Sequence, residues 1–167
     1  YVVQINPILI KISSKYKKLG VSTIAISSND VDKYPEDGPL KMKKHAKDNK
    51  YDFPYLFDET QEIARTYDAA CTPDIYLYDN NNLLVYRGQI DDSRPGNNEP
   101  LTGGDLIHAI ECLINKVEKK CGKHLKIYKN KHYHQHQHRH QMRFIILLKI
   151  LIVIFKKYVR VFVLNVK

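Results

Sequence analysis

The chain has 167 residues, which is long enough for one domain with a substantial hydrophobic core and too short for two domains of ordinary size. Its net charge of +9 arises in the tail: residues 1–120 hold 16 Lys and Arg against 18 Asp and Glu (16 − 18 = −2), whereas residues 121–167 hold 11 basic and no acidic residues. The body is therefore mildly acidic, and the basic tail carries no nucleic-acid-binding motif, which argues against a DNA-binding domain and against nucleic acid as a partner.

The cysteines are few and far apart. Cys71, Cys112 and Cys121 are an odd number and form no Cys-x-x-Cys pair. This pattern excludes both a zinc site of ordinary spacing and the disulfide framework of a small secreted domain. We expect a cytoplasmic protein with no metal and no cofactor.

The first half of the chain predicts a helix followed by a central strand. Apolar residues recur at spacings of three and four over residues 3–19, which indicates a helix, and Gly20 ends it. Residues 21–27 form a β-branched, mostly apolar run, typical of a strand that is buried on both faces and pairs in parallel.

Two further helices are expected before residue 70. Pro39 suits the first turn of a helix that reaches about Lys50. Residues 53–57 form a short extended segment, and Asp58 is placed to cap a second helix.

The last part of the body predicts a β-hairpin and a closing helix. Strands at 74–78 and 83–86 flank the turn-forming residues 79–82, and a helix begins at Asp105. The order of elements is that of an α/β protein with a mixed sheet.

The tail differs from the body in composition. Five histidines alternate with other residues between His132 and His140, and residues 144–155 are apolar except for Lys149. A weak metal site in the histidine tract is one interpretation, and a low-complexity stretch is the interpretation we favour. The apolar run is shorter than the roughly 20 residues of a membrane-spanning helix, so we expect no firm membrane contact. We divide the chain into one folded domain at 1–122 and a tail at 123–167 outside the fold.

Four stretches of the body resemble one family. They are Ala25-Ile26-Ser27-Ser28-Asn29-Asp30, residues 53–62 (FPYLFDETQE), Cys71-Thr72-Pro73-Asp74, and residues 86–97 (YRGQIDDSRPGN). All four resemble the thioredoxin-like proteins of the alkyl hydroperoxide reductase/thiol-specific antioxidant (AhpC/TSA, peroxiredoxin-related) superfamily. The resemblance covers about residues 1–127.

The resemblance implies a thioredoxin fold, a mixed sheet flanked by helices, without its first strand. In that family a Cys-x-x-Cys-Pro motif stands directly before a Tyr-Val pair, and Tyr1-Val2 resembles that pair. The chain is thus expected to be truncated at its N-terminus and to lack both the first strand and the main nucleophile. One side of the central strand would then be unpaired, an exposed edge that favours association.

The same resemblance implies the site residues. Thr72-Pro73 is expected to be cis and to face the dithiol, with Thr72 offering its backbone to an extended substrate. Cys71 is expected to be either a secondary thiol or a small half-buried apolar residue. Arg87 is expected to bind substrate. Asp91, Asp92 and Arg94 could shape a surface for a substrate or redox partner, although for these three we favour loop capping and ion pairing.

The expected function is that of a thiol-disulfide oxidoreductase or peroxiredoxin-like antioxidant. Its partners would be a thioredoxin- or glutathione-type reductant and a disulfide or peroxide substrate. The alternative is a non-catalytic thioredoxin-like scaffold or a truncated gene product. Cys112, between apolar residues of the last helix, is expected to be core.

Overall fold

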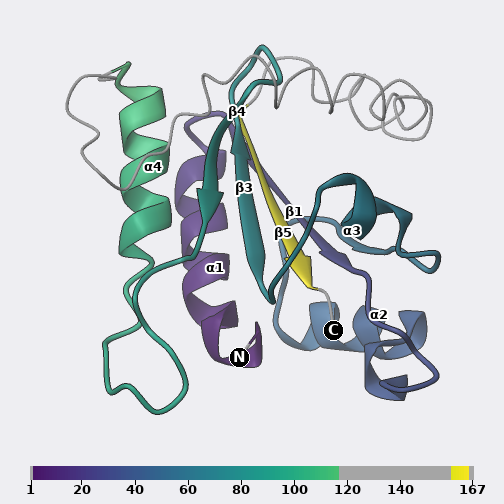
Figure 1. The fold of residues 1–167 in the computed structure, drawn as a ribbon. Helices are drawn as coiled ribbons and strands as arrows, with labels where there is room; N and C mark the ends of the chain where they lie inside the picture. The colour runs from purple at the N-terminus through teal and green to yellow at the C-terminus, as the bar shows by residue number, and fades with distance from the viewer. Residues whose placement is uncertain (1, 117–158, 166–167) are drawn as a thin grey trace.

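A five-stranded mixed sheet lies at the centre of the computed structural model, which describes residues 2–116 and 159–165 (Figure 1). The strand order is β2-β1-β5-β3-β4. The strands are β1 (Val21–Ser27), β2 (Tyr55–Phe57), β3 (Asp74–Tyr78), β4 (Leu84–Gly88) and β5 (Val159–Asn165). β1 pairs in parallel with β2 and β5, which confirms the prediction of a parallel strand at 21–27, although the central position is taken by β5.

The helices follow the sequence prediction with small shifts in their bounds. They are α1 (Val2–Lys17), the 3-10 helix η1 (Pro35–Asp37), α2 (Pro39–Asp48), α3 (Glu62–Thr66) and α4 (Gly104–Ile114). Pro39 opens α2 as predicted, because a helix needs no N–H from its first residue.

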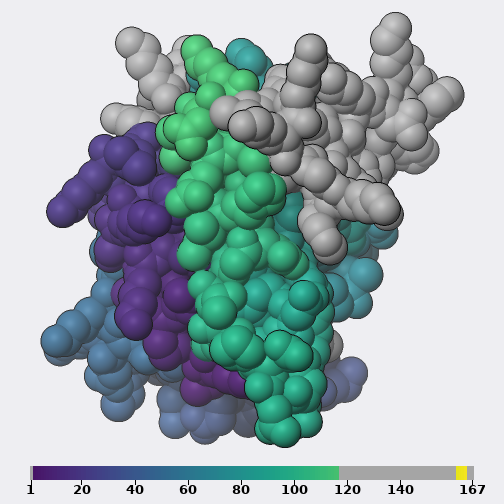
Figure 2. Space-filling model, turned by 90° about the vertical axis from the view of Figure 1, so that its left-hand side faces the viewer, coloured from purple at the N-terminus to yellow at the C-terminus, as the bar shows by residue number. Residues whose placement is uncertain are grey.

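The sheet has a hydrophobic core on each face. α1 and α4 pack on one face, where Ile5, Leu9 and Ile110 meet the inward side chains of β3 and β5. Figure 2 shows these two helices side by side. On the other face, Ile63 and Tyr67 lie against Ile24, Tyr76 and Phe162. The hairpin of β3 and β4 is antiparallel, as its turn residues predicted.

The tail differs most from expectation. Residues 123–167 were placed outside the fold, yet residues 159–165 form β5, paired in parallel with β1 and antiparallel with β3. The side of β1 that was expected to be unpaired is therefore covered. The physical reason is that residues 159–165 are mostly apolar, include three valines, and can pair with two strands that each need a partner. The histidine tract and the apolar run at 144–155 lie outside the described residues.

The helix expected to begin at Asp58 begins later. Gln61 has a φ of 56° and precedes the first residue of α3. Asp58 is buried, and its Oδ2 accepts hydrogen bonds from the Ser28 hydroxyl (2.7 Å) and from the Ala64 N–H (3.1 Å). The carboxylate thus accepts a first-turn N–H group of α3, as the capping prediction requires, and it also ties α3 to the end of β1.

In the parts of the chain that the structure describes, every helix is too short or too polar to cross a lipid bilayer.

Candidate functional site

A cleft of about 520 Å³ lies where α1 begins. Val2 and Val3 of α1, Met42 and His45 of α2, and Thr72 line it. The carboxyl ends of β1 and β5 lie at the same end of the sheet as the start of α1 (Figure 1). The cleft therefore brings the start of the first helix close to the Thr-Pro segment before β3.

The peptide bond between Thr72 and Pro73 is cis, which confirms the prediction. Pro73 is buried, and Thr72 is half-buried and lines the cleft. Thr72 thus lies at a surface where an extended ligand could meet it.

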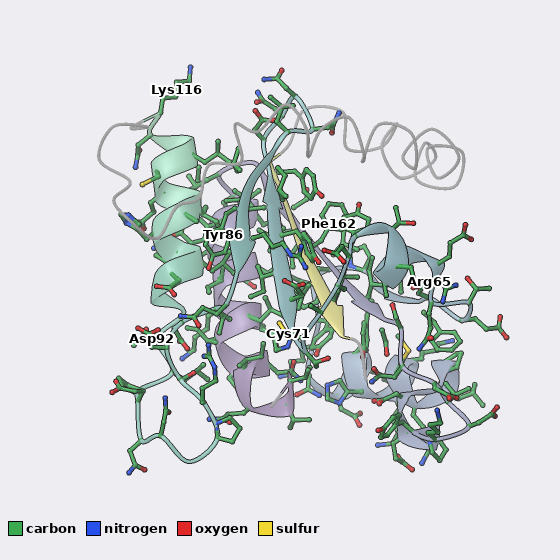
Figure 3. The ribbon with its side chains drawn as sticks, in the orientation of Figure 1. Arg65, Cys71, Tyr86, Asp92, Lys116 and Phe162 are labelled. Carbon is green, nitrogen blue, oxygen red and sulfur yellow. The ribbon has the colours of Figure 1, made fainter. Side chains whose placement is uncertain are left out.

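Cys71 is exposed and is the free cysteine among the described residues. Its Sγ lies 3.9 Å from the carbonyl oxygen of Pro73. Figure 3 shows Cys71 near the end of the sheet where β5 terminates. Burial of the sulfur, followed by the charge of Asp74, raises the pKa of the Cys71 thiol above its ordinary value. Arg87 and Arg94 act in the opposite direction without reversing that rise. The surroundings therefore favour a thiol over a reactive thiolate.

Asp74 anchors the polar network next to this thiol. Its Oδ2 is 2.9 Å from Nη2 of Arg87 and accepts the Tyr76 hydroxyl at 2.8 Å. The Arg87 guanidinium also lies over the Tyr76 ring, 5.1 Å from its centroid, and donates to the carbonyl oxygen of Asp68. Arg87 is thus a member of a buried ion pair behind the Thr-Pro segment. Asp74 was not among the predicted site residues and stood only as the last residue of the Cys71-Thr72-Pro73-Asp74 stretch.

Asp91 holds the loop that leads into α4. Its carboxylate is buried and accepts the backbone N–H groups of Ser93 (3.0 Å), Thr102 (2.7 Å) and Gly103 (2.6 Å), besides the Ser93 hydroxyl. Burial acts to raise the pKa of Asp91, but these hydrogen bonds outweigh it and hold the pKa below its ordinary value. The loop-capping interpretation fits this geometry.

Arg94 belongs to the same loop. Its Nη1 donates to the carbonyl oxygens of Asp91 (2.8 Å) and Ser93 (2.6 Å), and its Nη2 donates to Gln89. Its charge still reaches Cys71, since it favours the thiolate there. The structure therefore brings Cys71, Thr72, Pro73 and Arg87 together, with Arg94 within electrostatic range and Asp91 supporting the loop.

The sequence analysis missed a second polar cluster, which contacts the cleft through His45. The buried Asn6 side chain lies 2.8 Å through Nδ2 from Nε2 of His45, and its Oδ1 accepts the Tyr51 hydroxyl at 2.8 Å. Because Asn6 donates there, His45 accepts through Nε2. The Asn6–His45 contact joins α1 to α2. The only signal for it in the sequence was that Asn6 is a polar residue on the apolar face of the first helix.

Among the described residues, Cys112 does not line the cleft. Cys112 is half-buried on α4, with its Sγ 3.7 Å from Nε2 of His108. Cys121 lies outside the described residues. Within the described ranges no group of three or more His, Cys, Asp or Glu side chains could hold a metal ion.

The strand order, the helix before β1 and the cis proline before an antiparallel hairpin define a thioredoxin fold. Residues 6–87 match the model of the AhpC/TSA family, and this region of the chain belongs to that family.

Two solved structures are similar to the chain. One is an uncharacterized conserved protein from Geobacillus kaustophilus, with 49% sequence identity over 70% of this chain and 61% of that chain, and a TM-score of 0.68. The other is a hypothetical protein from Sinorhizobium meliloti 1021, with 42% identity over 70% of this chain and 63% of that chain, and a TM-score of 0.68. The chain thus spans somewhat less than two thirds of the length of either relative. Among curated proteins, none matches the chain.

Proposed function

We propose that the protein acts in cysteine redox chemistry, as a thiol-disulfide oxidoreductase or a peroxiredoxin-like antioxidant. The observation that carries the proposal is the cleft that joins the start of α1 to Thr72 in a domain of the AhpC/TSA family. Thr72 would meet the backbone of an extended disulfide substrate there, or a peroxide would enter the cleft. A thioredoxin- or glutathione-type thiol would return the protein to its reduced form.

The nucleophile in this proposal is not one of the three cysteines of this chain. They form no Cys-x-x-Cys pair, and the pKa of the Cys71 thiol is raised. A cysteine thiolate at the start of α1 would attack a substrate disulfide, forming a mixed disulfide and releasing one substrate thiol, or attack a peroxide, forming a sulfenic acid and releasing water or an alcohol. A second thiol would then attack the first sulfur, closing a disulfide and releasing the other substrate thiol or water.

A gain-of-function experiment tests this proposal. The chain is extended by a Cys-x-x-Cys-Pro segment placed directly before Tyr1, and a matched Ser-x-x-Ser-Pro extension serves as the control. We expect the cysteine version alone to reduce insulin disulfides or to consume peroxide with a dithiol donor. Failure of both reactions in a folded cysteine version would refute the proposal. Turnover by the unextended chain that is lost in Cys71→Ser would refute the assignment of the nucleophile.

A non-catalytic scaffold is the second candidate, and the raised pKa of the Cys71 thiol favours it. In that role the cleft would bind an extended peptide without chemistry. Binding of a peptide to the unextended chain, weakened by a bulky substitution at Thr72 and unaffected by Cys71→Ser, would support this candidate.

A further inference from the structure

The last strand of the chain occupies the centre of the sheet. β5 pairs with β1 over all seven residues from Val159 to Asn165, and with β3 from Arg160 to Leu164. Figure 1 shows it between the two. Without β5 the two neighbouring strands would be separated by about 10 Å, twice the normal spacing, and each would have a row of unpaired backbone groups.

The side chains of β5 belong to both hydrophobic cores. Val161 and Val163 lie in the cluster with α1 and α4, whereas Phe162 and Leu164 lie in the cluster with α3. None of the four is more than 4% exposed. One seven-residue segment therefore closes both faces of the domain.

The carboxyl end of β5 also adjoins the candidate site. Leu164 is the register partner of Asp74, and Asn165 is the partner of Ser27. Asp74 follows the cis proline and anchors Arg87. The seating of β5 therefore sets the position of the Thr72–Asp74 segment relative to the end of β1.

We propose that residues 159–165 are an insertable strand, which seats between β1 and β3 in its own chain and thereby assembles the cleft. Residues 117–158 separate it from Lys116, a connection of 42 residues that spans up to about 140 Å when extended. A connection of that length is long enough for the strand to leave its position while α4 stays in place. Both pairings of β5 are with strands of the same chain, so the proposal assigns the strand to its own chain.

Register-specific cross-linking tests the seating of the strand. Ile75 faces Val163 directly, whereas Leu77 faces Val161 and lies diagonal to Val163. Directly opposed Cα atoms in antiparallel strands are about 4.5–5.5 Å apart and diagonal ones about 7–8 Å, while a disulfide needs about 4.4–6.8 Å. In a Cys71→Ser background, Ile75→Cys/Val163→Cys should form an intramolecular disulfide on mild oxidation, as mapped by mass spectrometry of peptides.

The matched pair Leu77→Cys/Val163→Cys should not form that bond. Equal cross-linking in both pairs, or none in the first, would overturn the seating. A mixture of Ile75→Cys chains with Val163→Cys chains shows whether β5 of one chain pairs with β3 of a second copy. Cross-linked dimers there at micromolar protein would overturn the assignment of the strand to its own chain.

Hydrogen exchange tests whether the strand leaves its position without global unfolding. The cross-linked protein is compared with the same protein after reduction, at the amides of β1, β3 and α4. We expect cross-linking to slow exchange in β1 and β3 at least tenfold more than in α4, because β1 and β3 lose backbone hydrogen-bond partners when β5 leaves, whereas α4 loses side-chain packing alone. If cross-linking slowed amide exchange by the same factor in β1, β3 and α4, β5 would leave only when the whole domain unfolds, and the proposal would be overturned. Neither measurement depends on redox activity.

Discussion

Asp91 offers a sharp test of the loop that leads into α4. The substitution Asp91→Asn keeps the size of the side chain and removes its charge, at a residue that is 4% exposed. Oδ1 accepts the Ser93 N–H, and Oδ2 accepts the N–H groups of Thr102 and Gly103. An amide has one acceptor oxygen, so at least one buried N–H loses its partner.

The magnitude follows from these bonds. An orphaned buried donor costs about 1–3 kcal/mol, and the loss of charge on the remaining bonds costs about 1 kcal/mol more, which totals about 2–4 kcal/mol. Urea unfolding followed by far-UV circular dichroism at pH 7 measures this loss. The control is Asp92→Asn, since Asp92 is exposed and accepts one side-chain bond, from Gln89. A loss for Asp91→Asn within about 0.5 kcal/mol of the control would refute the reasoning.

The pH dependence of the unfolding free energy provides a second test of the role of Asp91. The pKa of Asp91 is lower in the folded protein than the ordinary value near 3.9, so the folded state favours the ionised form. The stabilisation is therefore complete above about pH 4 and is lost as the pH falls through the lowered pKa. The difference in unfolding free energy between wild type and Asp91→Asn should be constant near neutral pH and should shrink in acid.

Three further outcomes are expected. Arg87→Met leaves the Asp74 carboxylate buried without its ion-pair partner, so the free energy of unfolding measured in urea should fall by about 3–5 kcal/mol. The control is Arg65→Met, at an exposed side chain, which should lower that free energy by less than about 0.5 kcal/mol. Burial, with a smaller contribution from Tyr55, raises the pKa of Tyr51 to about 12. Because the unfolded chain ionises this tyrosine near pH 10, the free energy of unfolding should fall between about pH 10 and pH 12. Tyr51→Phe should remove that part of the fall. Alkylation of Cys71 by iodoacetamide should reach half its maximal rate above about pH 8.5, and a midpoint below that value would contradict the geometry.

Much of the fold could be predicted because its signals are local. The apolar run at 21–27 and the turn residues between β3 and β4 each determine their own structure within a few residues. The cis peptide bond at Thr72-Pro73 was inferred from the family resemblance, because the residues around the bond carry too weak a preference.

What could not be predicted depends on contacts between distant parts of the chain. Residues 159–165 are mostly apolar and include three valines, as a strand buried on both faces would be, but their place depends on unpaired edges of β1 and β3 that no local pattern reveals. The Asn6–His45 contact joins residues 39 positions apart, and each residue alone is unremarkable in its helix. The start of α3 at Glu62 was missed because the positive φ of Gln61 interrupts the turn after Asp58.

The aromatic contacts of Phe162 have a spectroscopic consequence. Its ring centroid lies 5.6 Å from that of Tyr78 and 5.8 Å from that of Tyr67, so one ring of β5 meets rings from β3 and from the turn after α3. The chain contains 12 tyrosines, five phenylalanines and no tryptophan. Its near-ultraviolet circular dichroism therefore arises mainly from tyrosines in asymmetric surroundings, with no tryptophan band overlapping the tyrosine signal. The position of the C-terminal strand can be followed by this signal in the unlabelled protein.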